Sequence, residues 1–153
     1  MALETIVVAI GPTEETRIVP LTETVVDVAG PANASVVLYH AFTERALRDG
    51  IKEAGFDPED PPDPGAVAER LESVVHLTEE LDEAGIDYEL HSGVEDPADG
   101  TLRLTEELDA DMLFVGGRKR SSTGKLIFGS TSQQLMMNAP CPVVFVRDEI
   151  DEN

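Results

Sequence analysis

Apolar residues along this chain form short continuous runs, separated by stretches in which they recur every three or four positions. Residues 4–10, ETIVVAI, form a continuous run rich in β-branched side chains, which is typical of a strand buried on both faces of a sheet. Four later runs are predicted to be strands for the same reason, and they occupy residues 35–41, 86–93, 111–117 and 142–147. The run at 86–93 is more polar than the others, so we expect it nearer an edge of the sheet.

The stretches between the strands have the spacing of amphipathic helices. In the first of them the apolar residues of 18–29 share one face, and the helix is predicted to end at Gly30 and Pro31. Pro20 lies within this pattern, so the helix is either kinked there or begins close to it. The clearest helix is predicted over 63–85, where an Asp-Pro start and a final glycine enclose one apolar stripe made of Val67, Leu71, Val74, Leu77 and Leu81.

Two further helices begin at recognisable capping residues. Asp96 and Pro97 repeat the Asp-Pro start ahead of a helix of leucines. The last helix is predicted to begin at Gly129 and Ser130, because Ser130 and Gln133 have the spacing of a capping box.

The segment 43–65 has the weakest pattern in the chain. Its first part is weakly helical, whereas 56–65 combines four prolines with four acidic residues and is predicted to be a surface loop. We therefore expect one domain over residues 1–153, with 43–65 as a variable surface region and 148–153 as an acidic tail.

Strands that alternate with helices predict βαβ units with right-handed crossovers, and therefore a parallel sheet covered by helices on both faces. The predicted fold class is an open-sheet α/β domain. In such sheets a ligand binds beyond the carboxyl ends of the strands, at the point where the strand order reverses. The residues that directly follow the strands, 11–13, 41–42 and 116–129, are therefore the candidate ligand-binding segments.

Charge narrows the possible partners. The chain has 153 residues, of which 31 are Asp or Glu and 11 are Lys or Arg, giving a formal net charge of −20. Such a surface repels nucleic acids and anionic membranes. It suits a high-salt environment, where self-repulsion is screened, although an acidic protein of ordinary salinity fits as well. No apolar run reaches the length of a membrane span and no signal peptide is evident, so we expect a cytoplasmic protein.

One long segment departs from this acidity. Residues 112–147 contain no Asp or Glu, yet they contain Arg118, Lys119, Arg120, Lys125 and Arg147. Burial accounts for the apolar ends of the segment but not for its cations, because burying unpaired charge is costly. A bound anion accounts for them directly.

Three features of this segment are typical of phosphate sites. Glycines at the end of the fourth strand allow close approach of a ligand, nearby cations neutralise its charge, and a helix start at 129–131 offers backbone N–H groups. Two better-known phosphate loops are excluded, because Leu126 follows Gly124-Lys125 where a Walker loop needs Ser or Thr, and no glycine-rich fingerprint follows the first strand.

The spacing of these residues resembles the signature of the universal stress protein family. The pattern begins at Gly116, continues after two intervening residues at position 119, and ends after nine further residues at Gly129 and Ser130. The helix that follows is succeeded by the segment NAPCPVVFVR. The similarity covers nearly the whole chain except about 43–65. It implies a five-stranded parallel sheet of order 3-2-1-4-5 and a dimer. In the ATP-binding branch it also implies phosphates at the glycine motif, adenine beside the second strand and ribose near the first.

Transferred residue by residue, the resemblance assigns ribose contacts to Ala9, Ile10 and Gly11 and an adenine contact to Ala41. It assigns the phosphate contacts to the glycine motif, with nearby cations supplying charge: Val115, Gly116, Arg118, Lys119, Gly129, Ser130 and Thr131. Two positions depart from the family pattern, since Lys119 replaces a glycine and Gly11 replaces the Asp that usually ends the first strand. Without that carboxylate, no protein ligand for Mg²⁺ is expected.

We therefore expect a dimeric stress-response regulator that binds ATP or a related adenine nucleotide, and we assign no catalytic residues. If 142–147 is an edge strand, as the resemblance implies, antiparallel pairing with the same strand of a second chain would cover it, unless the acidic tail alone protects the edge.

Two alternative functions remain. One is an interaction module that binds an acidic partner instead of a nucleotide, and the other is a weak ATPase. The single cysteine, Cys141, excludes an intramolecular disulfide, and the three histidines lack metal-ligand spacing.

Overall fold

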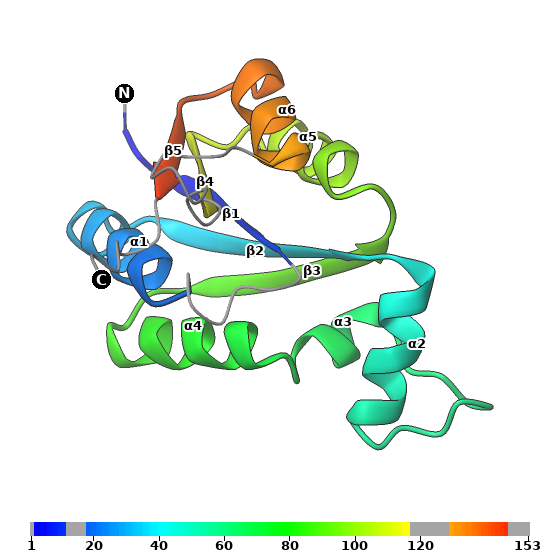
Figure 1. The fold of residues 1–153 in the computed structure, drawn as a ribbon. Helices are drawn as coiled ribbons and strands as arrows, with labels where there is room; N and C mark the ends of the chain where they lie inside the picture. Colours follow the sequence, from blue (N-terminus) through cyan, green and yellow to red (C-terminus); the bar gives the residue numbers. More distant parts are fainter. Residues whose placement is uncertain (1, 12–17, 117–128, 147–153) are drawn as a thin grey trace, which may run out of the picture.

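The five predicted strands form one parallel sheet. The computed structural model of the chain describes residues 2–11, 18–116 and 129–146. Its strands are joined in the order β3-β2-β1-β4-β5, and every neighbouring pair is parallel (Figure 1). Their bounds are β1 (Thr5–Ile10), β2 (Ser35–Phe42), β3 (Tyr88–Val94), β4 (Met112–Gly116) and β5 (Val143–Val146). The predicted fold class and strand order are confirmed.

The positions of β1 and β3 in the sheet follow their hydrophobicity. Ile6, Val7 and Val8 of β1 are 0% exposed, because β1 is central and helices cover both of its faces. No residue of β3 is buried, and β3 lies at one edge as its polar sequence predicted. β5 forms the other edge.

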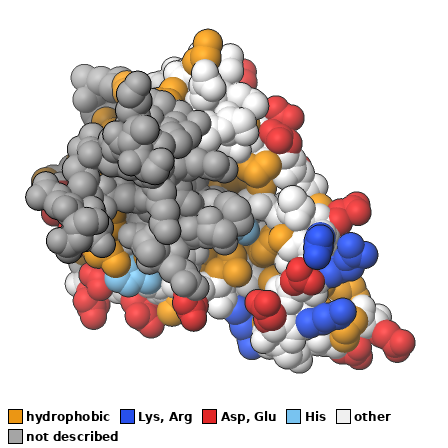
Figure 2. Space-filling view, viewed as in Figure 1, with side chains coloured by type: hydrophobic (Ala, Val, Ile, Leu, Met, Phe, Trp, Pro, Cys, Tyr) orange, Lys and Arg blue, Asp and Glu red, His pale blue; other side chains and the backbone are white. Residues whose placement is uncertain are grey.

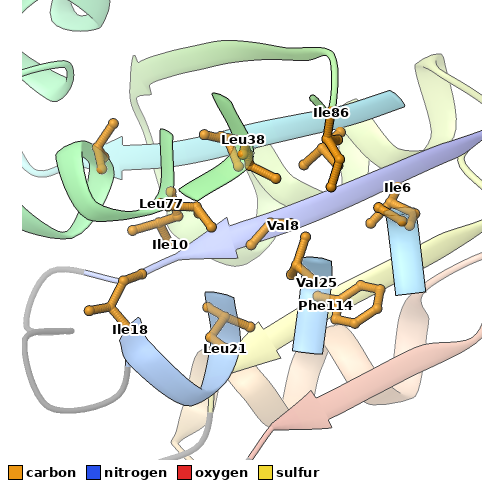
Figure 3. Close-up of a cluster of buried hydrophobic side chains, with 14 of the residues drawn as sticks. Ile6, Val8, Ile10, Ile18, Leu21, Val25, Leu38, Leu77, Ile86 and Phe114 are labelled. Atoms are coloured by element: carbon orange, nitrogen blue, oxygen red, sulfur yellow. The ribbon is translucent and has the colours of Figure 1, made fainter. Parts of the chain in front are cut away.

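Helices cover the two faces of the sheet in separate groups. One face carries α1 (Ile18–Ala32) and α4 (Glu72–Glu83), and the other carries α5 (Pro97–Glu107) and α6 (Ser130–Asn138) (Figure 1). Figure 3 shows the first core, in which side chains of β1, β2 and β4 meet those of α1 and α4. Because strand residues alternate between faces, β1 contributes Ile6, Val8 and Ile10 to this core and Val7 to the second.

The first helix extends one residue beyond the Gly30-Pro31 pair at which the sequence predicted its end. α1 continues through Gly30 and Pro31 to Ala32, and the chain reverses at Asn33, which has a left-handed φ of 55°. The N–H of Asn33 donates to the carbonyl of Gly30 (3.0 Å), and the N–H of Ala34 donates to that of Ala29 (3.1 Å), which is a Schellman motif. Since Asn tolerates the left-handed region, the glycine was not needed as the terminator. The described part of α1 begins at Ile18, so Pro20 lies in its first described turn.

The helix predicted over 63–85 is two helices. α3 (Pro64–Ala68) and α4 are separated at Leu71, whose extended backbone (φ −68°, ψ 136°) precedes the first turn of α4. Val67 and Ala68 pack with Phe42 in a small third cluster, whereas α4 packs on the main sheet core. One straight helix could not reach both clusters. Leu71 contacts both, and this is why the apolar spacing continues across the break.

The first part of the variable region 43–65, predicted to be weakly helical, forms a helix, and the loop predicted from residue 56 onward follows it as far as the start of α3. α2 (Glu44–Glu53) begins at Thr43, whose hydroxyl accepts a hydrogen bond from the N–H of Ala46 (3.0 Å). Ile51 is the buried residue of this short helix, and it anchors α2 against the third cluster. Figure 1 shows α2 and the following loop projecting from one end of the molecule.

Acidic side chains are scattered on the described part of the surface. On the face shown in Figure 2 they lie at many separate places around the described residues, not in a single patch. The acidic side chains seen on this face are therefore solvated.

Candidate functional site

The strand order reverses between β1 and β4, which is where open α/β sheets bind ligands. β1 pairs with β2 on one side and with β4 on the other, and Ala9 of β1 lies opposite Val115 of β4. Gly11 follows the last residue of β1, and Gly116 is the last residue of β4. The carboxyl ends of the two strands thus bring five predicted positions to one edge of the sheet: Ala9, Ile10, Gly11, Val115 and Gly116.

The remaining predicted positions are more dispersed. Ala41 lies near the end of β2, opposite Gly93 of β3, so β1 separates it from β4. Its side chain packs on the same face of the sheet as those of Ala9 and Val115. Arg118 and Lys119 lie outside the described residues.

The start of α6 supplies backbone donors on the side of the sheet where β4 ends, because a crossover helix runs antiparallel to its strands. The predicted capping box is wrong: the N-cap is Gly129, in an extended conformation (φ −71°, ψ 162°), and Ser130 is the first helical residue. The carbonyl of Gly129 accepts the N–H of Gln133 (3.0 Å), and no side chain of the described residues caps the helix. The N–H groups of Ser130 and Thr131, which have no partner within the helix, are therefore available to an acceptor from outside.

A buried histidine connects the ends of β1 and β2. His40 is 3% exposed, and its Nδ1 lies 2.9 Å from the carbonyl oxygen of Ile10, so Nδ1 carries the proton and donates it. The ring packs edge-on against Phe42 (centroids 4.5 Å apart). Ser92 of β3 donates its hydroxyl to the carbonyl of His40 (2.8 Å). His40 thus links the end of β1 to the end of β2 through its side chain.

His40 is predicted to make folding pH-dependent. Burial lowers the pKa of its imidazole, although the hydrogen bond to Ile10 opposes this shift. The folded state favours the neutral ring, so burying neutral His40 stabilises the folded protein fully above the pKa of the unfolded state, about 6.5. This contribution to the free energy of unfolding is lost as the pH falls toward the lower pKa of the folded state. Below pH 6.5 we expect wild-type protein to lose stability more steeply than His40→Asn, by at most about 1.4 kcal/mol per pH unit. Urea unfolding between pH 7 and pH 5 measures this difference, and parallel pH profiles would contradict it.

The structure contains a polar cluster beside this site that the sequence did not predict. Tyr39, 3% exposed, donates its hydroxyl to the Glu95 carboxylate, which also accepts a two-point contact from Arg103 of α5, with one Nη2–Oε1 distance of 2.8 Å. The hydrogen bond from Arg103 and then that from Tyr39 lower the pKa of Glu95, and burial is the main cause that raises the pKa of the Tyr39 hydroxyl. Glu95 is therefore ionised and Tyr39 protonated.

A glycine makes room for this cluster. A Cβ at Gly100 of α5 would lie 2.3 Å from the Tyr39 hydroxyl and 2.5 Å from Glu95 Oε1. A glycine inside a helix was the one signal available in the sequence, because an interior helix glycine usually has a packing reason. Tyr39 lies opposite Ala9 in the sheet, so the cluster borders the predicted contact residues.

The described residues contain little else that could perform chemistry. No group of three or more His, Cys, Asp and Glu side chains among them could hold a metal ion. Burial raises the pKa of the Cys141 thiol, which favours the unreactive protonated form. No helix among the described residues is long and apolar enough to cross a membrane.

The fold and the strand-end edge define the class: an open, parallel α/β domain with backbone donors at its topological switch point. The universal stress protein family model matches residues 2–147, and the chain belongs to this family. A universal stress protein of Mycolicibacterium smegmatis is 35% identical over 68 residues, which make up 44% of this chain and 52% of that protein. The aligned part thus spans about half the length of this curated relative.

Two solved structures share the fold. A universal stress protein from Archaeoglobus fulgidus in complex with dAMP has a TM-score of 0.66 and 20% identity, covering 95% of this chain and 99% of that one. A universal stress protein in complex with cAMP has a TM-score of 0.65 and 20% identity, covering 97% of this chain and 100% of that one.

Proposed function

We propose that this chain binds an adenine nucleotide at the carboxyl ends of β1 and β4, with a phosphate at the start of α6. The observation that carries the proposal is the glycine N-cap: Gly129 places no side chain over the first turn, so the donors of Ser130 and Thr131 face no competing cap among the described residues. Anions bind favourably at such a helix start because the N–H groups and the helix dipole act together.

The neighbouring glycines and alanines fit the rest of such a ligand. Gly11 and Gly116 leave the ends of β1 and β4 without side chains, so sugar or phosphate groups can approach the backbone. Ala41 offers a small apolar contact for a base. The dAMP and cAMP complexes of the two fold relatives support an adenine nucleotide as the ligand class. ATP is a candidate within that class, with charge from Arg118 and Lys119.

Ser130→Pro tests the donor directly. Proline is favourable at the first helical position and removes only its N–H, and the extended backbone of Gly129 is compatible with a following proline. We expect affinity for AMP and ATP, measured by calorimetry in high salt, to fall about 10- to 100-fold, because a hydrogen bond to a charged group is worth about 1.5–3 kcal/mol. The matched variant Ser130→Ala keeps the N–H and should bind more tightly than Ser130→Pro. Absence of binding by the wild-type protein would end the proposal.

We further propose that the protein acts as a dimeric regulator without catalytic turnover. Within the described sheet β5 is an edge strand next to β4, and its four residues are all partly exposed. An apolar edge strand of this kind is suited to pairing with a second copy. Antiparallel pairing of two β5 strands would give a two-fold dimer. Sedimentation equilibrium at molar salt should give twice the chain mass, and a monomer at all protein concentrations would contradict this part of the proposal.

A further inference from the structure

We propose that His40 is a positioning residue of the strand-end site, which holds the last peptide of β1 so that the N–H of Gly11 stays directed toward the ligand. The inference rests on the proposed nucleotide function and adds to it a residue that does not itself touch the ligand. It follows from the hydrogen bond between His40 and Ile10 and from the geometry of the peptide that joins Ile10 to Gly11.

The direction of the Ile10 carbonyl is fixed. It accepts from His40 Nδ1 at 2.9 Å, and His40 belongs to β2, so this carbonyl points toward β2. His40 is 3% exposed and its ring packs edge-on against Phe42, so the imidazole cannot swing away. The Ser92 hydroxyl holds the backbone of the same residue through its carbonyl.

The planar trans peptide then fixes Gly11. The carbonyl of Ile10 and the N–H of Gly11 belong to one peptide unit and point in opposite directions. With the carbonyl facing β2, the N–H of Gly11 faces β4. The strand alternation agrees, since Glu4 accepts from Ser35 of β2 (2.8 Å) whereas Thr5 accepts from Asp111 beside β4 (2.9 Å), so even positions of β1 face β2 and odd positions face β4.

This N–H is available to a ligand. Among the described residues no acceptor is found for it, although Gly11 is only partly exposed. The ladder between β1 and β4 ends at Ala9 and Val115, so the N–H emerges beyond the last paired residue, at the switch point. Gly11 has no side chain that could compete for it.

The chemistry required of the ligand is an oxygen acceptor. Phosphate oxygens and ribose oxygens can both accept a hydrogen bond from the N–H of Gly11. Adenosine and AMP separate the two sources, because only AMP carries the phosphate. If the affected contact is to phosphate, substitution of His40 should weaken AMP and leave adenosine nearly unchanged; if it is to ribose, both should weaken alike.

Two substitutions test the role of His40. His40→Leu fills the space without a donor, and His40→Asn places an amide nitrogen at the same δ position. We expect His40→Leu to weaken AMP binding about tenfold, the size of one hydrogen bond, and His40→Asn to recover most of that loss. Calorimetry on protein shown by circular dichroism to be folded provides the affinities.

Ser92→Ala is the matched control, because it removes a partly buried hydrogen bond to the His40 backbone without touching Ile10. It should lower stability while leaving the affinity for AMP unchanged. Equal affinities of wild type and His40→Leu for AMP would overturn the positioning role while leaving nucleotide binding intact, whereas a wild type that binds neither AMP nor adenosine would overturn both.

One measurement needs no variant. Nitrogen-15 spectra of the wild-type imidazole at pH 7 identify which ring nitrogen of His40 carries the proton. Protonation at Nδ1 is required, and a proton on Nε2 alone would overturn the inference.

Addition of AMP should also shift the amide resonance of Gly11, which is assigned by comparison with Gly11→Ala. A resonance that does not move when the protein is saturated with AMP would overturn the inference as well.

Discussion

Phe114→Ala is expected to lower the free energy of unfolding by about 3–5 kcal/mol, the range found when a fully buried phenylalanine is truncated. Phe114 lies on β4, is 0% exposed, and belongs to the core in which α1 packs on the sheet. Figure 3 shows it among Ile6, Val8 and Val25. Because this core is bounded by a sheet on one side and by two helices on the other, the surroundings cannot collapse to fill the cavity. The loss is a large fraction of the stability of a native protein, which is typically about 5–15 kcal/mol.

Urea unfolding in molar salt, where the repulsion among acidic groups is screened, gives the free energies. Val19→Ala is the control, since Val19 belongs to the helix that covers the same core but is 41% exposed. It should change stability by no more than about 0.5 kcal/mol. A cost below about 1 kcal/mol for Phe114→Ala would mean that β4 is not packed as described.

The sheet could be predicted because each strand carries its own signal. A continuous β-branched run predicts burial on both faces, and β1 is indeed central; polar β3 is an edge. Alternation with helices then determines parallel pairing, and parallel pairing brings Gly11 and Gly116 to one edge of the sheet. The main features of the site thus follow from local patterns combined with topology.

The errors arose where two structures share one local pattern. A stripe of apolar residues has the same spacing whether α3 and α4 form one helix or bend at Leu71, and only the position of a separate cluster around Phe42 requires the bend. A Ser followed by Gln three residues later fits a capping box, yet the preceding Gly129 takes the N-cap position. Neither choice can be made within a window of a few residues.

The polar cluster of Tyr39, Glu95 and Arg103 could not be predicted from the sequence for a different reason. Tyr39 and Glu95 are 56 residues apart in the sequence, and nothing near either residue indicates the other. In a chain where one residue in five is acidic, a single glutamate is uninformative. Only Gly100 marked the place, and a glycine shows that space is needed without showing what fills it.

The expected effect of Gly100→Ala is therefore opposite in sign to that of an ordinary glycine replacement in a helix. Helix propensity alone would stabilise α5 by about 1 kcal/mol. The new methyl group, however, would lie 2.3 Å from the Tyr39 hydroxyl and 2.5 Å from Glu95 Oε1. The buried Tyr39 ring cannot move away, so the hydrogen bond to Glu95 must break. We expect a net loss of about 1–3 kcal/mol in the free energy of unfolding.

Tyr39→Phe provides the decisive partner for a double-mutant cycle. Removing the hydroxyl eliminates the nearest clash and frees Glu95, whose side chain is 26% exposed, to shift toward Arg103. The double variant should therefore be more stable than the sum of the single effects predicts, by at least about 1 kcal/mol. Gly30→Ala is the matched control, because a Cβ there meets nothing within 4 Å and the propensity gain should appear undiminished. Additive effects of Tyr39→Phe and Gly100→Ala would show that the cost of the alanine arises elsewhere in α5.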